Sequence, residues 1–306
     1  MTYNGIQYFA INKSEPDPEP SPEPEPGPEP EPITPPSSIE NCLRFTALGD
    51  GSTVSIEIND YEDYTTGEEY YMDEGDFIYS TDEGSTWNRL VFTEHQSDII
   101  NLDEGDSVVF SGHNTALAER IAGGVSHHMF YLGGEFTASG DVTSLLNGEG
   151  GDVPLTEDCT FYGLFSGNES LTMAPNLPST TLSGDCYQYM FQYCTSLTTA
   201  PALPATELTE NCYQYMFQYC TSLTTAPELP ATTLAYGCYS FMFYHCSNLN
   251  YVKAMFITEP DGTFNSWLDA VASTGTFVMN SSAEWNPENY RGRVIPMDWT
   301  VETASE

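Results

Sequence analysis

Six cysteines recur at two fixed positions of a repeated unit and are the residues most able to do chemistry. The two cysteines of each copy are eight residues apart, and eighteen residues separate one pair from the next; they are Cys186, Cys194, Cys212, Cys220, Cys238 and Cys246. Such a set could form a ladder of disulfides or hold a metal. Zinc sites, however, use closely spaced Cys pairs or a matching His pattern, and the sequence has neither. The repetition favours small buried residues that fill equivalent core positions.

The remaining groups that could act in catalysis are few. The chain has no GxSxG, HExxH or phosphate-binding glycine motif, and no cysteine with a histidine at a meaningful interval. His127-His128 has no further ligand at a fixed spacing, and the acidic turns 73–76 and 103–106 lack the spacing of an EF-hand loop. We therefore expect a protein that is not an enzyme, with no cofactor and no metal site. Calcium binding by the two turns is left open.

Residues 80–87 fit the pattern SxDxGxTW, which is similar to the Asp-box motif of sialidases. Asp82 is expected to accept hydrogen bonds from turn amides, Gly84 to supply the turn conformation and Trp87 to pack inward. A sialidase-type site would also need a cluster of arginines for the substrate carboxylate, whereas this chain has one box and three arginines in that region. The motif therefore predicts a structural hairpin and no enzyme site.

The cysteines belong to a 26-residue unit that recurs without slippage from residue 186 to residue 249. An earlier, degenerate copy places Leu164-Phe165 one period before Met190-Phe191. A repeat of this length predicts stacked supersecondary units, none of which buries its apolar face alone. The segment CYQYMFQYC has apolar spacings near 3.6 and is compatible with a helix, whereas the prolines of SLTTAPALP predict a short extended segment.

The sequences on both sides of the repeats have different patterns. Short runs that alternate apolar and polar residues fill 39–150, and they predict a small antiparallel β-sandwich because no long helix separates the strands. After the repeats, 265–271 predicts a short helix capped by Asn265 or Ser266. Three large aromatic residues are expected to form the core of a cap over the open end. They are Trp267, Trp285 and Trp299.

The first 38 residues predict a projection rather than a domain. Residues 1–13 lack acidic groups and form a short strand-capable segment, whose apolar and aromatic members include Tyr3, Ile6, Tyr8, Phe9 and Ile11. Such a segment could be a disordered terminus or a peptide that docks on another protein. Residues 14–38 are rich in alternating proline and acidic residues, which predicts a stiff spacer that reaches roughly 60–70 Å. An apolar tip on such a rod favours the docking peptide.

The charge of the chain limits its partners. It carries 45 acidic residues against 7 Lys and Arg, a formal net charge of -38, and no cation lies between Arg120 and Lys253. Because Lys and Arg are needed to neutralise phosphates, nucleic acid and anionic membrane surfaces are unfavourable partners. The chain has no run of 18 apolar residues, and its first residues do not show a basic segment followed by an apolar one. We therefore predict neither a membrane span nor Sec export.

The units CYxxMFxxCxSLTxAPxLPATxL, over about residues 155–256, resemble the BspA-like leucine-rich repeats that are common in surface proteins of gut Bacteroidetes and in their phages. The sequences before and after the repeats also resemble the flanks that such repeats often carry. The resemblance implies a curved solenoid used for adhesion and for binding protein or glycan, and not for catalysis. The chain departs from bacterial surface members in lacking a signal peptide or lipoprotein cysteine.

We therefore expect a mixed, mainly β fold with five parts. They are a docking peptide (1–13), an extended linker (14–38), an N-terminal β-sandwich (39–150), a short BspA-like leucine-rich-repeat solenoid (151–256) and a C-terminal cap (257–306).

Two functions agree with this layout. The first is a phage virion-associated fibre or capsid decoration protein, held to a capsid or tail protein by residues 1–13 and binding a host-surface protein or glycan through its repeats. The second is a bacterial cell-surface adhesin. About half of the repeated tyrosines are expected to pack between copies, and at least one ladder to be exposed. The candidate binding residues are Tyr187, Gln188, Tyr189, Tyr193, Tyr213, Gln214, Tyr215, Tyr219, Tyr239 and Tyr244. The oligomeric state, a homo-oligomer included, is left open.

Overall fold

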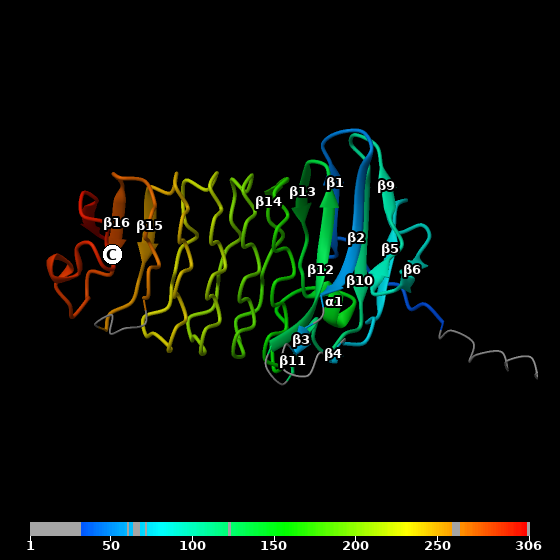
Figure 1. Cartoon of the computed structure of the whole chain (residues 1–306), viewed down its shortest axis with the longest axis horizontal. Coiled ribbons are helices and arrows are strands. Elements are labelled where there is room, and N and C mark those ends of the chain that lie inside the picture. The colour runs from blue at the N-terminus through cyan, green and yellow to red at the C-terminus, as the bar shows by residue number, and fades with distance from the viewer. Residues whose placement is uncertain are drawn as a thin grey trace, which may run out of the picture. The chain divides into compact units, whose positions relative to one another are not determined.

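The computed structural model describes residues 32–59, 61–63, 68–70, 72–121, 124–258 and 264–304 (Figure 1). The chain divides into two units, Met1–Pro32 and Ile33–Glu306. The predicted docking peptide and most of the predicted linker lie outside the described residues. The fold below is that of the second unit.

Two six-stranded sheets form the part of the fold that leads into the repeats, and the first of them includes one strand of the first repeat. The first has the order β14-β13-β1-β10-β5-β6, and its described pairs are antiparallel except for the parallel pair β13–β14. Its strands are β1 (Leu43–Ala47), β5 (Phe77–Ser80), β6 (Asn88–Arg89), β10 (Ser107–Gly112), β13 (Phe136–Ser139) and β14 (Leu171–Met173). In β1, buried residues alternate with half-buried ones, as the two-residue period of a strand with one core face requires.

The second sheet has the order β11-β12-β2-β8-β7, with β9 also paired to β2. Its strands are β2 (Ser52–Asn59), β7 (Phe92–Thr93), β8 (Gln96–Ser97), β9 (Ile100–Leu102), β11 (Ala118–Ile121) and β12 (Gly124–Gly133). A separate pair joins β3 (Tyr61–Asp63) to β4 (Glu68–Tyr70), and one helical turn, α1 (Ser144–Asn147), follows β13.

Aromatic side chains join the two sheets. Phe45 of β1 and Phe110 of β10 contact Phe130 of β12, with ring centroids 5.0 and 5.1 Å apart, and all three are fully buried. Phe130 in turn stacks on Phe165 of the first repeat at 5.5 Å. The buried aromatic core therefore continues from the sheets into the repeats, which stabilises both by burying their apolar surface together.

The repeats lie side by side between β14 and β15 (Figure 1). We name them by their first residues: copy 1 begins at Thr160, copy 2 at Cys186, copy 3 at Cys212 and copy 4 at Cys238. Alternate backbone amides of copy 2 donate to carbonyls of copy 3 over distances of 2.8–3.0 Å. The amides between them donate three residues back within their own copy. Each copy is thus bonded to the next at every second residue, as strands are in a sheet.

The segment CYQYMFQYC, whose spacing is compatible with a helix, is not helical. Every fourth residue has a positive φ, as at Asp185, Tyr189 and Tyr193, with values between +53° and +61°. A side chain in this conformation costs about 1–2 kcal/mol and interrupts a helix, so the segment is a series of tight turns. The true local period is four, and it is close enough to 3.6 to imitate a helix over nine residues. The prediction of a helix at 265–271 is wrong for the same reason, because Ser266 and Ala270 also have positive φ.

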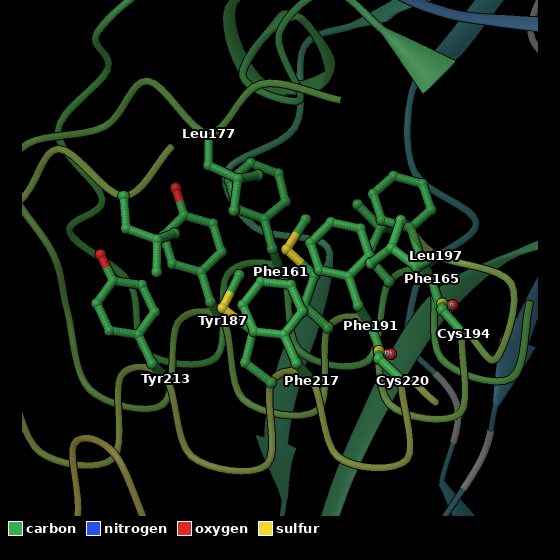
Figure 2. Packing of buried hydrophobic residues seen from close by; sticks show 14 of the residues in the cluster. Phe161, Phe165, Leu177, Tyr187, Phe191, Cys194, Leu197, Tyr213, Phe217 and Cys220 are labelled. Carbon is green, nitrogen blue, oxygen red and sulfur yellow. Dashed lines mark hydrogen bonds between the residues drawn. The ribbon is translucent and has the colours of Figure 1, made fainter. Parts of the chain in front are cut away.

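The interior of the stack is built from ladders of like residues (Figure 2). One ladder runs through Phe165, Phe191, Phe217 and Phe243, whose neighbouring rings are 5.5–5.6 Å apart and nearly parallel. Stacking of identical side chains fills the core at every level with the same shape.

The C-terminal residues cover the last copy. Three parallel strands form a sheet in the order β15-β16-β17: β15 (Tyr251–Ala254), β16 (Thr276–Met279) and β17 (Thr300–Thr303). A short 3₁₀ helix, η1 (Pro287–Tyr290), lies between β16 and β17. Trp267, Trp285 and Trp299 are at most 6 % exposed, which confirms their predicted place in a core. Trp267 packs against Tyr239 of copy 4, with ring centroids 6.1 Å apart.

The predicted mainly β class is confirmed in this part of the chain. Among the described residues the only helices are α1 and η1, each four residues long. None of the described helices is long and apolar enough to cross a membrane.

Candidate functional site

Three of the predicted binding residues belong to the core. Tyr187, Tyr213 and Tyr239 are each 1 % exposed and stack on one another, with neighbouring ring centroids 5.9 and 6.2 Å apart. Figure 2 shows the first two beside the phenylalanine ladder. A side chain without exposed surface cannot contact a ligand, so we withdraw these three from the candidate surface.

The other tyrosines form two exposed or half-buried rows. Row A consists of Tyr189, Tyr215 and Phe241, with neighbouring ring centroids 4.6 and 4.8 Å apart. Row B consists of Tyr193, Tyr219 and His245, with both spacings 4.7 Å. Within each row the planes are tilted by at most 11°. The prediction did not include Phe241 and His245, although the 26-residue register points to both.

Amide side chains lie beside the two rows. Gln188 Nε2 donates to Gln214 Oε1, and Gln192 Nε2 donates to Gln218 Oε1. Copy 4 has Tyr244 in the register of Gln192 and Gln218. Its ring contacts Phe241 of row A at 5.8 Å and His245 of row B at 4.3 Å. Because one side chain touches both rows, the rows border the same surface. We call rows A and B with these amides the outer face.

The stacking decides which atoms the outer face presents. Rings stacked at 4.6–4.8 Å cover one another's faces, so a row presents ring edges and hydroxyl groups. The expected stacking of a ligand on tyrosine faces is therefore possible only at the end of a row. In copies 2 and 3 the surface along the rows therefore carries tyrosine hydroxyls and glutamine amides at equivalent positions. These hydroxyl and amide groups donate and accept hydrogen bonds.

The cysteines do not form this site. All eight are buried and free. The second cysteine of each copy donates from Sγ to a backbone carbonyl of the preceding copy: Cys194 to Phe165, Cys220 to Phe191 and Cys246 to Phe217. Burial raises the pKa of Cys212 to about 12. Since the thiolate is the reactive form, these thiols are inert at neutral pH, which confirms the interpretation as core packing.

The Asp-box hairpin agrees with its predicted structural role. Asp82 accepts hydrogen bonds from the backbone N–H and the hydroxyl of Thr86, both at 2.8 Å, and these bonds lower the pKa of Asp82. Gly84 has a φ of +79°. The prediction for Trp87 is wrong: it is half-buried and borders an open pocket of about 410 Å³ beside Pro35 and Pro36. Nearby Arg44 is paired with Glu83, so it is engaged in the fold.

His128 and the acidic turns also have structural partners. The imidazole of His128 lies 3.3 Å from the Leu117 carbonyl and 3.0 Å from the Glu74 carbonyl. In one acidic turn Asp76 pairs with Arg89, and in the other the N–H of Asp106 donates to the carbonyl of Asp103. Within the described part of the chain, no group of three His, Cys, Asp or Glu side chains is placed to hold a metal.

Lowering the pH is expected to destabilise the folded protein through its two buried histidines. Burial lowers the pKa of His127 to about 4 and also lowers that of His128, whereas both titrate near 6.5 in an unfolded chain. Between pH 4 and pH 6.5 the unfolded state binds more protons than the folded state. The contribution of the buried histidines to the free energy of unfolding is therefore complete above pH 6.5 and declines as the pH falls toward 4. Relative to a His127→Gln variant, the wild type should lose about 1–2 kcal/mol between pH 7 and pH 5. Urea unfolding at pH 7 and pH 5 measures this loss of stability. Equal losses in the wild type and the His127→Gln variant would contradict the prediction.

Comparison with known proteins adds no relative. The chain matches no family model, no curated protein and no solved structure.

Proposed function

We propose that this chain is a phage virion-associated fibre or capsid decoration protein that binds a host-surface protein or glycan. In this proposal the two sheets are a β-sandwich, the copies are a BspA-like leucine-rich-repeat solenoid and the C-terminal residues are its cap. Residues 1–13 anchor the chain to a capsid or tail protein, and the acidic proline-rich segment holds the repeats away from the particle.

The observation that carries the binding function is the outer face. Buried ladders such as Phe191–Phe217 are required to fold the stack, but rows A and B are not needed to complete that core. Even so, both rows keep an aromatic ring in copies 2, 3 and 4, at backbone positions with strained positive φ. Stabilising the stack does not require this pattern on a surface. It suits a face that makes the same contact repeatedly with one extended partner.

The acidic charge of the copies disfavours anionic partners. The outer face lies within residues 121–252, which contain no Lys or Arg. Polyanions would meet repulsion from the acidic residues of the copies and find no cation to pair with. Partners without excess negative charge remain. Among them, neutral glycans and polar protein surfaces accept and donate hydrogen bonds of the kind that glutamine and tyrosine make.

A second candidate is a bacterial cell-surface adhesin. The resemblance of the repeats to BspA-like units favours it, because such units are common in surface proteins of gut Bacteroidetes. In this second candidate the same outer face binds the partner, but the chain is attached to a bacterial cell surface and not to a virus particle. Neighbouring genes for capsid and tail proteins would favour the virion, and a secretion cassette would favour the adhesin.

Removing the row A rings and the amides of copies 2 and 3 is expected to weaken attachment to cells and glycans, because a repeated partner then loses part of the outer face in both copies. The test variant carries Gln188→Ala, Tyr189→Asn, Gln214→Ala and Tyr215→Asn. Asparagine is chosen because it tolerates positive φ better than alanine does. A matched control carries Thr206→Ala and Thr232→Ala, two exposed positions of the proline-containing segments. Attachment of fluorescently labelled protein to host cells and to a neutral-glycan array measures the effect. Unchanged attachment by a folded test variant would overturn the binding role.

Deleting residues 1–13 is expected to release the protein from particles while its fold is kept. Wild-type and truncated chains are expressed in trans during infection and followed through particle purification. Truncated protein that copurifies with particles at the wild-type level would contradict the anchor.

A further inference from the structure

Row B lacks one ring at its beginning. The residue one period before Tyr193 is Gly167, whose φ of +75° is close to the +61° of Tyr193 and the +63° of Tyr219. The backbone of copy 1 therefore has the conformation that carries a ring in copies 2 and 3, but it has no side chain there. A Cβ built on Gly167 would have no atom within 4 Å. The space directly above the Cα of Gly167 is therefore open.

Row A shows that such a gap need not stay open. The corresponding residue of copy 1 is Gly163, and a Cβ there would lie 2.8 Å from His127 Nε2. The first ring of row A, Tyr189, is covered by Tyr162, with ring centroids 5.3 Å apart and planes tilted by 62°. The ring of His127 contacts Tyr162 in turn at 5.2 Å. The chain thus closes the beginning of row A with two rings and leaves the beginning of row B uncovered.

The open position exposes one aromatic face. Tyr193 is 44 % exposed, whereas Tyr219, which has a stacked ring on each side, is half-buried. Gly167 is bonded to copy 2 next to this ring, because its N–H donates to the Gln192 carbonyl at 2.7 Å. Gln192 Nε2 donates to Gln218, so its Oε1 is the acceptor at this end of the amide row. An uncovered ring and a hydrogen-bond acceptor therefore lie side by side.

A second exposed ring borders copy 1 on its other side. Strand β12 lies against this copy, because the N–H of Phe130 donates to the Leu164 carbonyl at 2.9 Å. The side chain of Asn168 also bonds the Phe130 carbonyl and the Leu132 N–H. Tyr131 lies between these two residues, and its side chain is 55 % exposed while theirs are buried. Since side chains alternate along a strand, Tyr131 points away from the core.

We propose that the open end of row B, at Gly167 and Tyr193, binds a single pyranose ring of a neutral glycan. The C–H face of the sugar stacks on the uncovered face of Tyr193 in the space above Gly167, and its hydroxyls bond to Gln192. An anionic sugar is disfavoured because copies 1–4 up to residue 252 contain no Lys or Arg. This inference rests on the proposed binding function and assigns it a ligand class and one defined subsite.

The test fills the gap without touching the core. Gly167→Tyr adds the missing ring at a backbone conformation that tyrosine already adopts at residues 193 and 219. Gly167→Ala is the matched control, because it introduces a side chain at the same positive φ but leaves the ring space open. Tyr193→Asn removes the platform. Thermal unfolding first confirms that all three variants are folded.

Binding is measured by saturation-transfer NMR with four methyl pyranosides: the β-glucoside, the β-galactoside, the α-mannoside and the N-acetyl-β-glucosaminide. We expect wild type and Gly167→Ala to bind at least one of them, and Gly167→Tyr and Tyr193→Asn to bind it at least about tenfold more weakly. No binding by wild type, or equal binding by a folded Gly167→Tyr variant, overturns the subsite. The subsite is also overturned if a peptide with an aromatic side chain binds at Tyr193 and none of the sugars does, because the site then recognises protein.

The two proposals fail in different ways. If Gly167→Tyr binds the pyranosides and host cells as wild type does, the subsite is wrong and the outer face stands. If the pyranosides bind as predicted but the outer-face variant attaches to cells normally, the subsite stands and the role of row A and its amides in cell attachment is wrong.

Discussion

Replacing Phe217 with alanine should lower the free energy of unfolding by about 3–5 kcal/mol. Phe217 is fully buried at the centre of the phenylalanine ladder, with neighbouring rings 5.6 Å away on both sides. Its removal leaves a cavity between Phe191 and Phe243, and these two rings cannot close it because their copies are fixed by backbone hydrogen bonds on each side. Both the lost burial and the remaining cavity therefore reduce stability.

The matched control is Tyr219→Asn, two residues further along the same copy. It removes a ring of row B, which is half-buried and stacks on its neighbours at 4.7 Å. Its loss should cost about 1 kcal/mol, with asparagine keeping the positive φ. Guanidinium unfolding followed by circular dichroism compares the two variants. A loss at Phe217 no larger than that at Tyr219 would mean that the buried ladder does not hold the stack together.

Replacing Asn168 with alanine should lower the free energy of unfolding by about 2–5 kcal/mol. Asn168 occupies the position that Cys194, Cys220 and Cys246 occupy in later copies. It is buried, accepts from the Leu132 N–H at 2.8 Å and donates to the carbonyls of Phe130 and Phe165 at 2.7 and 3.0 Å. Alanine leaves the buried Leu132 N–H and the Phe130 carbonyl without this partner, and unpaired buried backbone groups are costly.

An exposed asparagine provides the control for this prediction. Asn248 donates one hydrogen bond to the Thr221 carbonyl at 2.8 Å from the surface of copy 4, so Asn248→Ala should cost less than about 1 kcal/mol. Asn168→Cys, which restores the residue of the later copies, should remain destabilising because its thiol cannot replace three hydrogen bonds. Denaturant unfolding of the three variants measures the differences. Wild-type stability of Asn168→Ala would show that the seam between β12 and copy 1 does not depend on this side chain.

Much of the core was predictable from the sequence. The 26-residue register places each cysteine and phenylalanine at an equivalent level, and equivalent residues of stacked units meet the same surroundings. For this reason the register alone identifies the cysteines as packing residues and predicts the ladder through Phe191 and Phe217. The buried tryptophans, Trp267 among them, follow from the need to cover an open end with large apolar side chains.

The orientation of the tyrosines was not predictable in the same way. Tyr187 and Tyr189 have the same chemistry and lie two residues apart, yet the first is buried and the second borders the outer face. Their difference depends on a turn with positive φ at every fourth residue, and a tyrosine gives no sign of that conformation in sequence. The glycines of copy 1 do carry such a sign. Gly163 and Gly167 stand at the register of Tyr189 and Tyr193, which marks both positions as left-handed.

The central proposal, display of the outer face on a virus particle, has one most direct measurement. Particles and an outer-membrane fraction are prepared from the same culture that expresses this chain, and both are analysed by quantitative mass spectrometry. The particles are then imaged by cryo-electron microscopy. We predict that the chain copurifies with the particles at a fixed ratio to the capsid or tail protein, with its repeats projecting outward. A chain that is absent from particles and enriched in the outer-membrane fraction would contradict the proposal and favour the bacterial adhesin.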